Sequence, residues 1–365
     1  MSRRVIFFDH AGTPGGGQLS AARLLPLLQE VEPIALYLTG GSVAEQMRES
    51  GIRTTVLEPT GDFSTAALFR YARTAAQYLR TVDPSVPVVA MSTAAAQVLA
   101  LVPRGRRPRL LRLSEDMQRY QQRGIKSLAY FRLIFPRFDG FLSNSEWTSS
   151  TIPASLRTIP VRLAYPLSGV QRTAQRSTPV LEEPTVRIAC FSRAARWKGL
   201  DLAIDAVGRL TSGDRPVQLT IFGGEAQSEP DYAAELRQTA QRSGAEVVFA
   251  GHVDDVLTAM QDVDIVIMPS RLPEPFGQVT VQSLAAGCLT VVSAHGGSLE
   301  IVEDQRTGLT FPPDDASGLH RVLAAALNDS RTASSVAEAG CSSASRFTDA
   351  ALARDFESAM LALLS

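Results

Sequence analysis

The sequence predicts an α/β protein built from two doubly wound domains that face a central cleft. The chain has 365 residues, 45% of them hydrophobic. This length exceeds what one hydrophobic core typically supports and suits two domains. Short β-branched or aromatic segments without strict polar alternation recur between helical segments, as in parallel sheets covered by helices. This pattern stops at a polar, proline-containing segment and then begins again, so we expect two units and a linker.

The first half alternates between candidate strands and candidate helices. Each strand candidate is short and apolar enough to be buried on both faces. The expected strands are Val5–Phe8, Ile34–Leu38, Thr54–Leu57, Val86–Met91, Leu110–Leu113 and Gly140–Ser143, and the expected helices include Gln18–Leu28, Ser64–Leu79 and Ile125–Phe135.

The second half repeats the alternation after the polar segment. Its expected strands are Val186–Phe191, Val217–Ile221, Val247–Phe249, Asp264–Met268 and Leu289–Val292, and its expected helices include Leu200–Leu210 and Tyr232–Arg242. The final segment has apolar residues at helical spacing, which predicts a helix that packs one face on a domain. The predicted organisation is a first domain over residues 1–168, a linker over 169–184, a second domain over 185–346 and a C-terminal helix over 347–365.

Composition restricts the class of protein. The net charge of −1 gives no overall bias toward nucleic acid, but residues 1–170 hold 20 Lys/Arg against 12 Asp/Glu, and the remainder holds 16 against 25. The two halves are therefore expected to meet different partners. Three widely spaced cysteines suggest neither a disulfide framework nor a metal site, and no apolar stretch is typical of a signal peptide or membrane span. We expect a cytoplasmic protein.

A glycine-rich turn follows the first expected strand. The segment DHAGTPGGGQLSAARLL joins strand, turn and helix, which can form an anion site from free helix N–H groups. It does not fit G-x-G-x-x-G, so a dinucleotide fold is disfavoured. The alternative is a tight turn without a ligand.

Two basic residues follow the first strand of the second half. That strand delivers Ser192 and Arg193 to the carboxyl edge of its sheet, where ligands of open α/β folds bind. Lys198 stands before Gly199 and an expected helix, and it is one of only two lysines beside 34 arginines. An arginine fork and a compact ammonium suit a diphosphate leaving group. The alternative is two solvated surface cations.

The segment EPFG lies between the expected strand over residues 264–268 and a helix. Glu274 precedes that helix, whose first amides belong to Gly277, Gln278 and Val279, and Gln282 lies about one and a half turns inside it. A carboxylate accepts hydrogen bonds from sugar hydroxyls, and a glutamine can bond ribose hydroxyls. The alternative is an ordinary loop-to-helix junction with a solvated carboxylate.

These segments together resemble the retaining GT-B-fold glycosyltransferases of the large group 1 family. Each motif alone is weak, but their order and spacing form a strong signal along nearly the whole chain. The matching motifs are the glycine loop over residues 15–17, S-N-S-E at Ser143–Glu146, S-R-x-x-x-W-K-G at Ser192–Gly199, F-x-G-x-V at Phe249–Val253, E-P-F-G at Glu274–Gly277, G-G-x-x-E at Gly296–Glu300 and T-G-L at Thr307–Leu309.

The resemblance implies roles for these residues. Arg193 and Lys198 would hold the donor diphosphate, and Glu274 would contact the donor sugar. The final helix would return to the first domain. The expected donor site further includes Gly16 and Gly17 from the first domain, Gly251, His252 and Val253 at the nucleobase, and Ser192, Phe276, Gly277, Gln278, Val279 and Gln282.

Two departures from the family pattern concern the donor and the acceptor. The family has glutamate at the position of Gln282, so this chain keeps the hydrogen bond and loses a charge. The family often carries a histidine on a first-domain loop, which is absent from the comparable stretch LLRLSEDMQRY. Ser114, Glu115 or Asp116 are candidates to contact the acceptor instead, with His10 beside the glycine loop. His295 is expected to be structural.

The resemblance also implies a reaction. A sugar moves from a nucleoside diphosphate, UDP or GDP foremost, to a hydroxyl of a glycan, a lipid-linked saccharide or a small molecule, with retention. The nucleotide sugar is a substrate, so no cofactor is expected, and cations and helix N-termini take the place of a metal. Domain closure would expel water.

The stretch from Arg104 to Arg137 holds ten Lys/Arg and two acids with interspersed aromatic residues, among them Tyr120. Such a stretch suits contact with anionic lipid at the inner face of a membrane, and the alternative is a solvated face.

Three rival functions differ in what they predict. A non-catalytic nucleotide-sugar-binding protein, which Gln282 motivates, would bind without turnover. A Rossmann oxidoreductase would bind NAD(P). A sugar-nucleotide epimerase would release an altered sugar nucleotide without an acceptor.

Overall fold

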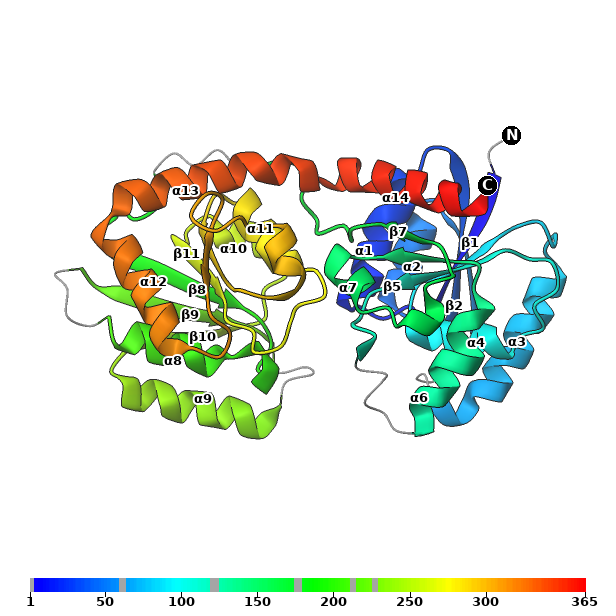
Figure 1. Cartoon of the computed structure of the whole chain (residues 1–365), viewed down its shortest axis with the longest axis horizontal. Coiled ribbons are helices and arrows are strands. Elements are labelled where there is room, and N and C mark those ends of the chain that lie inside the picture. Colours follow the sequence, from blue (N-terminus) through cyan, green and yellow to red (C-terminus); the bar gives the residue numbers. More distant parts are fainter. Residues whose placement is uncertain (1–2, 59–63, 119–124, 174–178, 211–214, 225–228) are drawn as a thin grey trace. The chain divides into compact units, whose positions relative to one another are not determined.

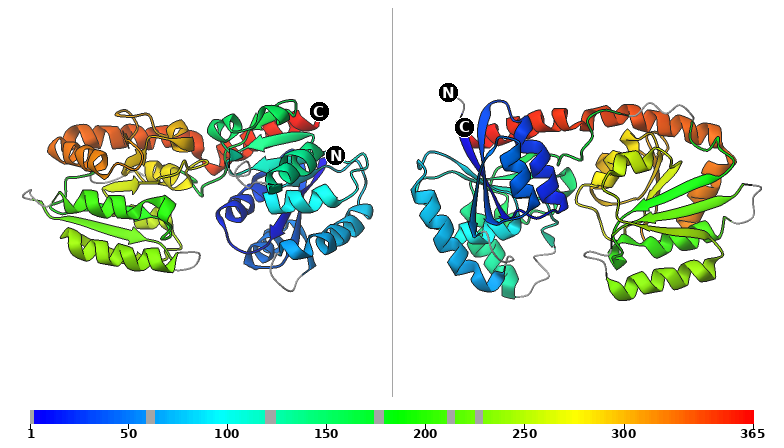
Figure 2. Two further views of the ribbon diagram at one scale, coloured as in Figure 1. Left: turned by 60° about the horizontal axis from the view of Figure 1, so that its bottom comes forward. Right: turned by 180° about the vertical axis from the view of Figure 1, so that it is seen from behind.

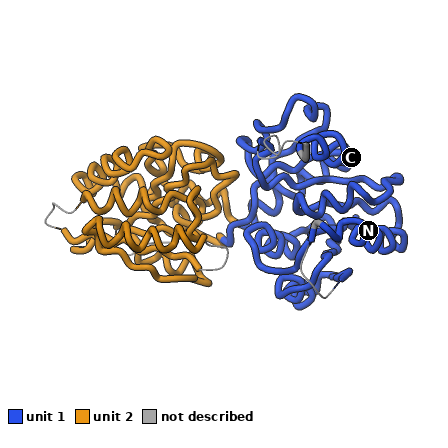
Figure 3. Tube along the Cα trace, turned by 90° about the horizontal axis from the view of Figure 1, so that it is seen from below, with its two compact units in different colours: residues 1–169, 349–365 blue, residues 170–348 orange. Residues whose placement is uncertain are grey.

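A computed structural model describes residues 3–58, 64–118, 125–173, 179–210, 215–224 and 229–365. The chain forms two compact units (Figure 3): Met1–Gly169 with Asp349–Ser365 make unit 1, and Val170–Thr348 make unit 2. In each unit, helices lie on both sides of a central sheet (Figures 1 and 2). Tyr120 of the basic stretch lies outside the described residues.

Unit 1 contains a seven-stranded sheet in the order β3-β2-β1-β4-β5-β6-β7, and all its strand pairs are parallel. Residues Val5 to Phe8 of β1 are at most 2% exposed, because helices cover both faces. The strands are β1 (Arg3–Ala11), β2 (Val31–Thr39), β3 (Arg53–Glu58), β4 (Val88–Ala90), β5 (Arg109–Leu113), β6 (Gly140–Ser143) and β7 (Val161–Leu163).

The helices of unit 1 include two short ones that begin at serine caps. Ser92 Oγ accepts from the Ala95 amide at the start of α4, and Ser145 Oγ accepts from the Thr148 amide at the start of α7. The S-N-S-E motif therefore ends a strand and caps a helix. The helices are α1 (Gly16–Leu24), α2 (Ser42–Glu49), α3 (Leu68–Arg80), α4 (Thr93–Leu101), α6 (Ile125–Ala129) with a π-helix over Tyr130–Ile134, α7 (Glu146–Ser150) and α14 (Asp349–Leu364).

The C-terminal helix α14 belongs to unit 1. The buried Glu357 carboxylate accepts hydrogen bonds from the amides of Gln29, Glu30 and Val31 at 2.8–3.1 Å. At the start of the helix, the buried Asp349 carboxylate accepts from the amide of Gly169 at 3.0 Å. The start and the middle of α14 are thus held by backbone amides far away in the sequence.

Unit 2 contains a six-stranded sheet in the order β10-β9-β8-β11-β12-β13, again with parallel pairs. Its strands are β8 (Val186–Phe191), β9 (Val217–Phe222), β10 (Glu246–Gly251), β11 (Ile265–Met268), β12 (Leu289–Ser293) and β13 (Leu309–Phe311). Its helices are α8 (Leu200–Gly208), α9 (Pro230–Ser243), α10 (Val256–Met260), α11 (Gln278–Ala285), α12 (Ala316–Asn328) and α13 (Ser330–Ser343).

Part of the segment expected as a linker packs on the core of unit 2. Val180 and Leu181 are each 2% exposed within that core. The Leu181 amide donates to Asp264 Oδ1 at 2.9 Å, and the other oxygen of the same carboxylate accepts from the Arg187 amide. The polar composition of the segment did not reveal this anchoring.

Each sheet reverses its winding direction at one pair of strands. In unit 1 the chain moves outward from β1 through β2 to β3, then starts again at β4 on the other side of β1. In unit 2 the corresponding pair is β8 and β11. Ligands of doubly wound folds bind at the carboxyl ends of such pairs, so these two edges position the candidate sites.

Candidate functional site

The main candidate site lies at the carboxyl ends of β8 and β11 in unit 2. The first residue after β8 is Ser192, whose amide donates to the Phe222 carbonyl at 2.7 Å. Arg193 follows and is half-buried. A β-carbon on Gly223 would overlap the Ser192 carbonyl oxygen, so glycine lets the end of β9 approach this turn closely.

Lys198 reaches the site from a short 3₁₀ turn over Arg196–Lys198. Its ammonium donates to Glu274 Oε1 at 2.6 Å, and the two side chains are 21% and 15% exposed. Gly199 ends the turn with φ 65°, and a β-carbon there would overlap the Pro269 carbonyl oxygen. Glycine is therefore required where the turn packs against the loop after β11.

Two further contacts fix Glu274. Ser270 Oγ donates to the same Oε1 atom at 2.6 Å, and the Gly297 amide donates to the Glu274 carbonyl at 2.8 Å. Gly296 has φ 71°, and a β-carbon there would lie 2.6 Å from the Glu274 carbonyl oxygen. The G-G-x-x-E motif thus supports the loop that carries Glu274.

His295 is the last link in this network. Its Nε2 lies 2.9 Å from the Ser270 carbonyl oxygen, so Nε2 carries the proton and donates. Burial lowers the pKa of His295, while the Ser270 carbonyl and the Glu274 carboxylate act in the opposite direction. The imidazole is therefore neutral at pH 7 and keeps one tautomer.

Helix α11 begins beside Glu274. Its N-cap is Gly277, with φ 106° and no side chain to cap the first-turn amides, which belong to Gln278 and Val279. The Phe276 side chain is 3% exposed and packs edge-on against Phe347, with ring centroids 6.2 Å apart. Phe276 thus anchors the loop in the core, and its side chain is not exposed for a ligand. Gln282 is half-buried in the second turn.

The expected nucleobase segment follows β10. Gly251 has φ 76° and its carbonyl accepts from the Gly223 amide at 2.7 Å. The side chain of His252 is 72% exposed and its Nε2 lies 3.2 Å from Asp254 Oδ1. Val253 beside it is half-buried. These residues share the sheet edge with Ser192, but His252 bonds its neighbour rather than the Lys198–Glu274 pair.

The expected residues of unit 1 gather at the β1–β4 edge. His10 Nδ1 lies 2.8 Å from Asp9 Oδ1 and 2.9 Å from Ser92 Oγ, while Gln18 donates to the other Asp9 oxygen at 3.1 Å. Gly16 and Gly17 are the first two residues of α1. The expected acceptor residues follow β5: Glu115 is exposed, and Asp116 Oδ1 accepts from the Gln118 amide.

Sequence reasoning missed Ser270, whereas the structural role expected for His295 agrees with its hydrogen bond to the Ser270 carbonyl. The signal for Ser270 was its position directly after a parallel strand, where polar residues reach the ligand edge. The signal for His295 was its place before the glycine pair. Neither position reveals a contact between the two, because 25 residues separate them. Among the described residues, no three His, Cys, Asp or Glu side chains converge on a metal position.

Comparison with known proteins identifies the domain that carries the main site. Residues 171–342 match the family model for Glycosyl transferases group 1. We call this segment, which makes up a little less than half of the chain, the group 1 domain because of its similarity to that family. The group 1 domain contains Arg193, Lys198, Glu274 and Gln282, together with the supporting network.

Curated relatives match the group 1 domain. Glycogen synthase of Anaeromyxobacter is 35% identical over 167 residues, which cover 44% of this chain and 33% of that protein. Mannosylfructose-phosphate synthase of Agrobacterium fabrum is 30% identical over 162 residues, which cover 42% and 35%. The chain thus spans about a third of the length of these relatives.

Solved structures match both units. Anabaena Alr3699/HepE in complex with UDP and glucose has a TM-score of 0.81 at 20% identity, covering 99% of this chain and 100% of that chain. A glycosyltransferase from Rickettsia africae has a TM-score of 0.78 at 16% identity and covers both chains fully. These similarities confirm the predicted fold of two doubly wound α/β units, GT-B. No described helix combines the length and apolar character needed to cross a membrane.

Proposed function

We propose that the chain transfers a sugar from a nucleoside-diphosphate sugar to a hydroxyl acceptor. The Lys198–Glu274 pair carries this proposal: a cation and a carboxylate, partly exposed and 2.6 Å apart, at the ligand edge of a group 1 domain. A departing diphosphate needs positive charge, and a transferring sugar offers hydroxyls to a carboxylate. One pair of side chains supplies both.

In the proposed mechanism, the residues act in fixed roles. Arg193 offers a planar fork to phosphate oxygens, and Lys198 a compact positive charge. The first turn of α11 adds backbone amides and a positive helix end. Negative charge grows on the diphosphate as the sugar departs, so these groups stabilise the transition state more than the ground state. Glu274, fixed by Ser270 and Lys198, orients the sugar.

The donor is proposed to be a UDP- or GDP-hexose, and the similarity to a structure that holds UDP and glucose favours UDP-glucose as the first compound to test. Retention of configuration follows from the family resemblance. In this proposal Gly251, His252 and Val253 border the base and Gln282 bonds the ribose. The unit 1 residues Gly16, Gly17, His10, Glu115 and Asp116 have proposed roles that rest on the resemblance.

A thermal-shift panel of UDP-, GDP-, dTDP- and ADP-sugars tests the central proposal. At least one nucleotide sugar should stabilise the wild type by mass action. Arg193→Ala and Lys198→Ala should remove most of that shift, whereas Arg209→Ala, which breaks an exposed i,i+4 ion pair of α8 with Asp205, should keep it. If no nucleotide sugar stabilises the wild type, the proposal fails.

One alternative function has a specific motive, namely Gln282 in place of the family's glutamate. A non-catalytic nucleotide-sugar-binding protein would show the thermal shift but no transfer with any acceptor. In that case Gln282→Glu would leave turnover absent. In the proposed enzyme, single-turnover release of nucleotide is measurable with the wild type.

The acceptor is proposed to be a glycan or a lipid-linked saccharide at the inner face of a membrane, contacted through residues 104–137. Leu128 of α6 and Leu133 of the adjoining π-helix are five residues apart, the spacing that hydrogen bonds join in a π-helix. Both side chains are exposed, at 58% and 62%. Arg132 and Arg137 are exposed beside them, and Tyr130 packs inward. Exposed leucines between arginines suit an anionic bilayer.

Co-sedimentation with vesicles tests the membrane proposal. The wild type should bind vesicles that contain phosphatidylglycerol, weakly at high salt, and should not bind pure phosphatidylcholine. Leu128→Glu with Leu133→Glu should abolish binding, while Phe69→Glu, at a residue of α3 that is 80% exposed, serves as the control. If the wild type does not bind these vesicles, or binds them equally at high salt, the membrane proposal is wrong.

A further inference from the structure

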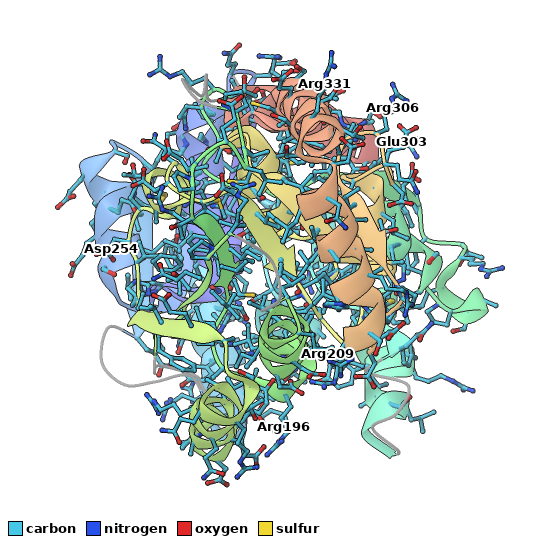
Figure 4. The ribbon with its side chains drawn as sticks, turned by 90° about the vertical axis from the view of Figure 1, so that its left-hand side faces the viewer. Arg196, Arg209, Asp254, Glu303, Arg306 and Arg331 are labelled. Carbon is cyan, nitrogen blue, oxygen red and sulfur yellow. The ribbon has the colours of Figure 1, made fainter. Side chains whose placement is uncertain are left out.

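A pocket of about 480 Å³ opens on unit 2 between the 196–198 turn, α9 and the residues that follow β11. Its volume lies within the roughly 300–1,000 Å³ of small-molecule sites. The Lys198–Glu274 pair is not part of its lining. Figure 4 labels Arg196, which lies beside α9 at this pocket.

Apolar and aromatic groups supply part of the lining. The rings of Trp197 and Tyr232 belong to it. Tyr232 is only 3% exposed and Arg196 covers its ring at 5.1 Å, so the half-buried Trp197 supplies the aromatic face. Leu272 also lines the pocket and is 49% exposed. Such surfaces stack well on the flat apolar face of a ring-shaped ligand.

The charged groups of the lining neutralise one another. Arg196 makes two hydrogen bonds to the Glu235 carboxylate at 2.7 and 2.6 Å. Arg271 makes two bonds of 2.7 Å to Asp201. Arg271 also pairs with Asp314 at 2.6 Å. Both cations are therefore already matched by carboxylates, and a charged ligand would find no unpaired counter-charge.

The paired groups still offer hydrogen bonds to a neutral ligand. A guanidinium has five N–H donors and a carboxylate has about four lone-pair positions. Arg271 already donates to Asp201, Asp314 and the Arg196 carbonyl, so the Arg196–Glu235 pair retains the larger capacity toward hydroxyl groups. Planar polar groups at the rim and aromatic groups in the lining together match a saccharide ring, which has a polar edge and an apolar face.

We propose that this pocket is a second ligand site that binds a neutral saccharide ring, separate from the donor site. It lies next to the donor site, because the Lys198 ammonium sits over the Trp197 ring, 4.2 Å from its centroid. A sugar in this pocket is held by stacking and by hydrogen bonds to the two ion pairs, without any role for a nucleotide.

The two tryptophans of the chain make the test direct. In Trp147→Phe, Trp197 is the only remaining indole and reports on the pocket by fluorescence. Titration with maltotriose and with cellotriose should give a saturable spectral shift for at least one of them, with a dissociation constant in the millimolar range or below. Glucuronic acid, which is charged, should give a shift at least tenfold weaker.

Matched variants on α9 locate the binding. Thr239→Phe fills the pocket from its lining and should weaken sugar binding at least tenfold, while Gln238→Phe, one residue earlier and outside the lining, should not. Both variants are first checked for an unchanged melting temperature, and Leu272→Asp serves as a second pocket variant. The proposal is overturned if neither neutral trisaccharide gives a saturable shift, or if the pocket variants bind as the wild type does. If the protein binds no nucleotide sugar, the proposed function fails but this titration is unaffected, because it contains no nucleotide.

Discussion

The functional residues of unit 2 depend on a short chain of side-chain contacts. Lys198 and Ser270 both donate to one oxygen of Glu274, and His295 donates to the backbone of Ser270. One oxygen of the Glu274 carboxylate therefore accepts two hydrogen bonds. A variant that keeps the shape and changes the charge separates the role of Glu274 from that of its neighbours.

Glu274→Gln should separate sugar recognition from nucleotide recognition. The glutamine amide cannot form the ion pair with Lys198, but Lys198 keeps its positive charge. Binding of the nucleoside diphosphate alone should therefore persist. Binding of the nucleotide sugar should weaken and kcat should fall about 10²-fold, the scale of losing one hydrogen-bonding group at an active site. Isothermal titration with the diphosphate and the diphosphate sugar checks this. Glu303→Gln, at an exposed pair with Arg306 (Figure 4), is the control, and equal losses for both ligands would contradict the assigned role.

His295 should make the stability of the fold depend on pH. Burial lowers its pKa in the folded state below the unfolded value of about 6.5, so the folded protein binds fewer protons there. The stabilisation that neutral His295 contributes to the folded state is fully present above the unfolded pKa and is lost as the pH falls through the folded pKa. The free energy of unfolding, measured in urea, should therefore fall less between pH 7.5 and pH 5 in His295→Gln than in the wild type. The glutamine amide can still donate to Ser270. The same pH dependence in both proteins would refute the explanation.

At the scale of elements, glycines set how closely the site's loops approach one another. Gly199 and Gly244 both have φ near 70°, but a β-carbon would overlap Pro269 only at Gly199 and would meet open space at Gly244. The two positions thus form a matched pair that differs in packing and shares the backbone conformation.

Gly199→Ala should cost more than Gly244→Ala. Left-handed strain alone should lower the free energy of unfolding of Gly244→Ala by about 1 kcal/mol. Gly199→Ala should lower it by at least about 2 kcal/mol and should also abolish the stabilisation by nucleotide sugar, because Lys198 moves. Chemical denaturation with and without ligand measures both effects. Equal costs would show that the contact with Pro269 is unimportant.

Helix α14 offers a second test at this scale. Removing the Glu357 carboxylate would leave three backbone amides without their acceptor, so Glu357→Ala should lower the free energy of unfolding by about 3 kcal/mol. Asp355→Ala, at an exposed position of the same helix, should change it by less than about 0.5 kcal/mol. A loss below about 1 kcal/mol for Glu357→Ala would mean that apolar packing alone holds the helix.

For the whole molecule, the proposed reaction assigns phosphate neutralisation to fixed protein groups. Arg193, Lys198 and the start of α11 supply positive charge without an added ion. Transfer should therefore continue in excess EDTA at about the original rate, as measured by nucleotide release. A loss of more than about tenfold that magnesium restores would show that a metal assists the leaving group.

Much of the fold was accessible from local sequence patterns. All eleven expected strands coincide with strands of the two sheets, because parallel strands buried on both faces are short apolar runs wherever they occur. The edge strands β7 and β13 were missed: each has three residues and, unlike the equally short β4, is not buried throughout. Helices α12 and α13 were not predicted, and the anchoring of Leu181 was hidden in a polar segment.

The sequence by itself determined the α/β class, the two cores and the positions of Arg193, Lys198 and Glu274 at strand ends and helix starts. These properties are local, since periodicity and turn residues act over a few positions. Only the tertiary structure decided that Lys198 bonds Glu274 across 76 residues, that His295 supports Ser270, and that Glu357 accepts three amides more than 320 residues away. Such contacts depend on strand order, because that order brings distant strand ends to one edge, and no local pattern encodes the distance between them.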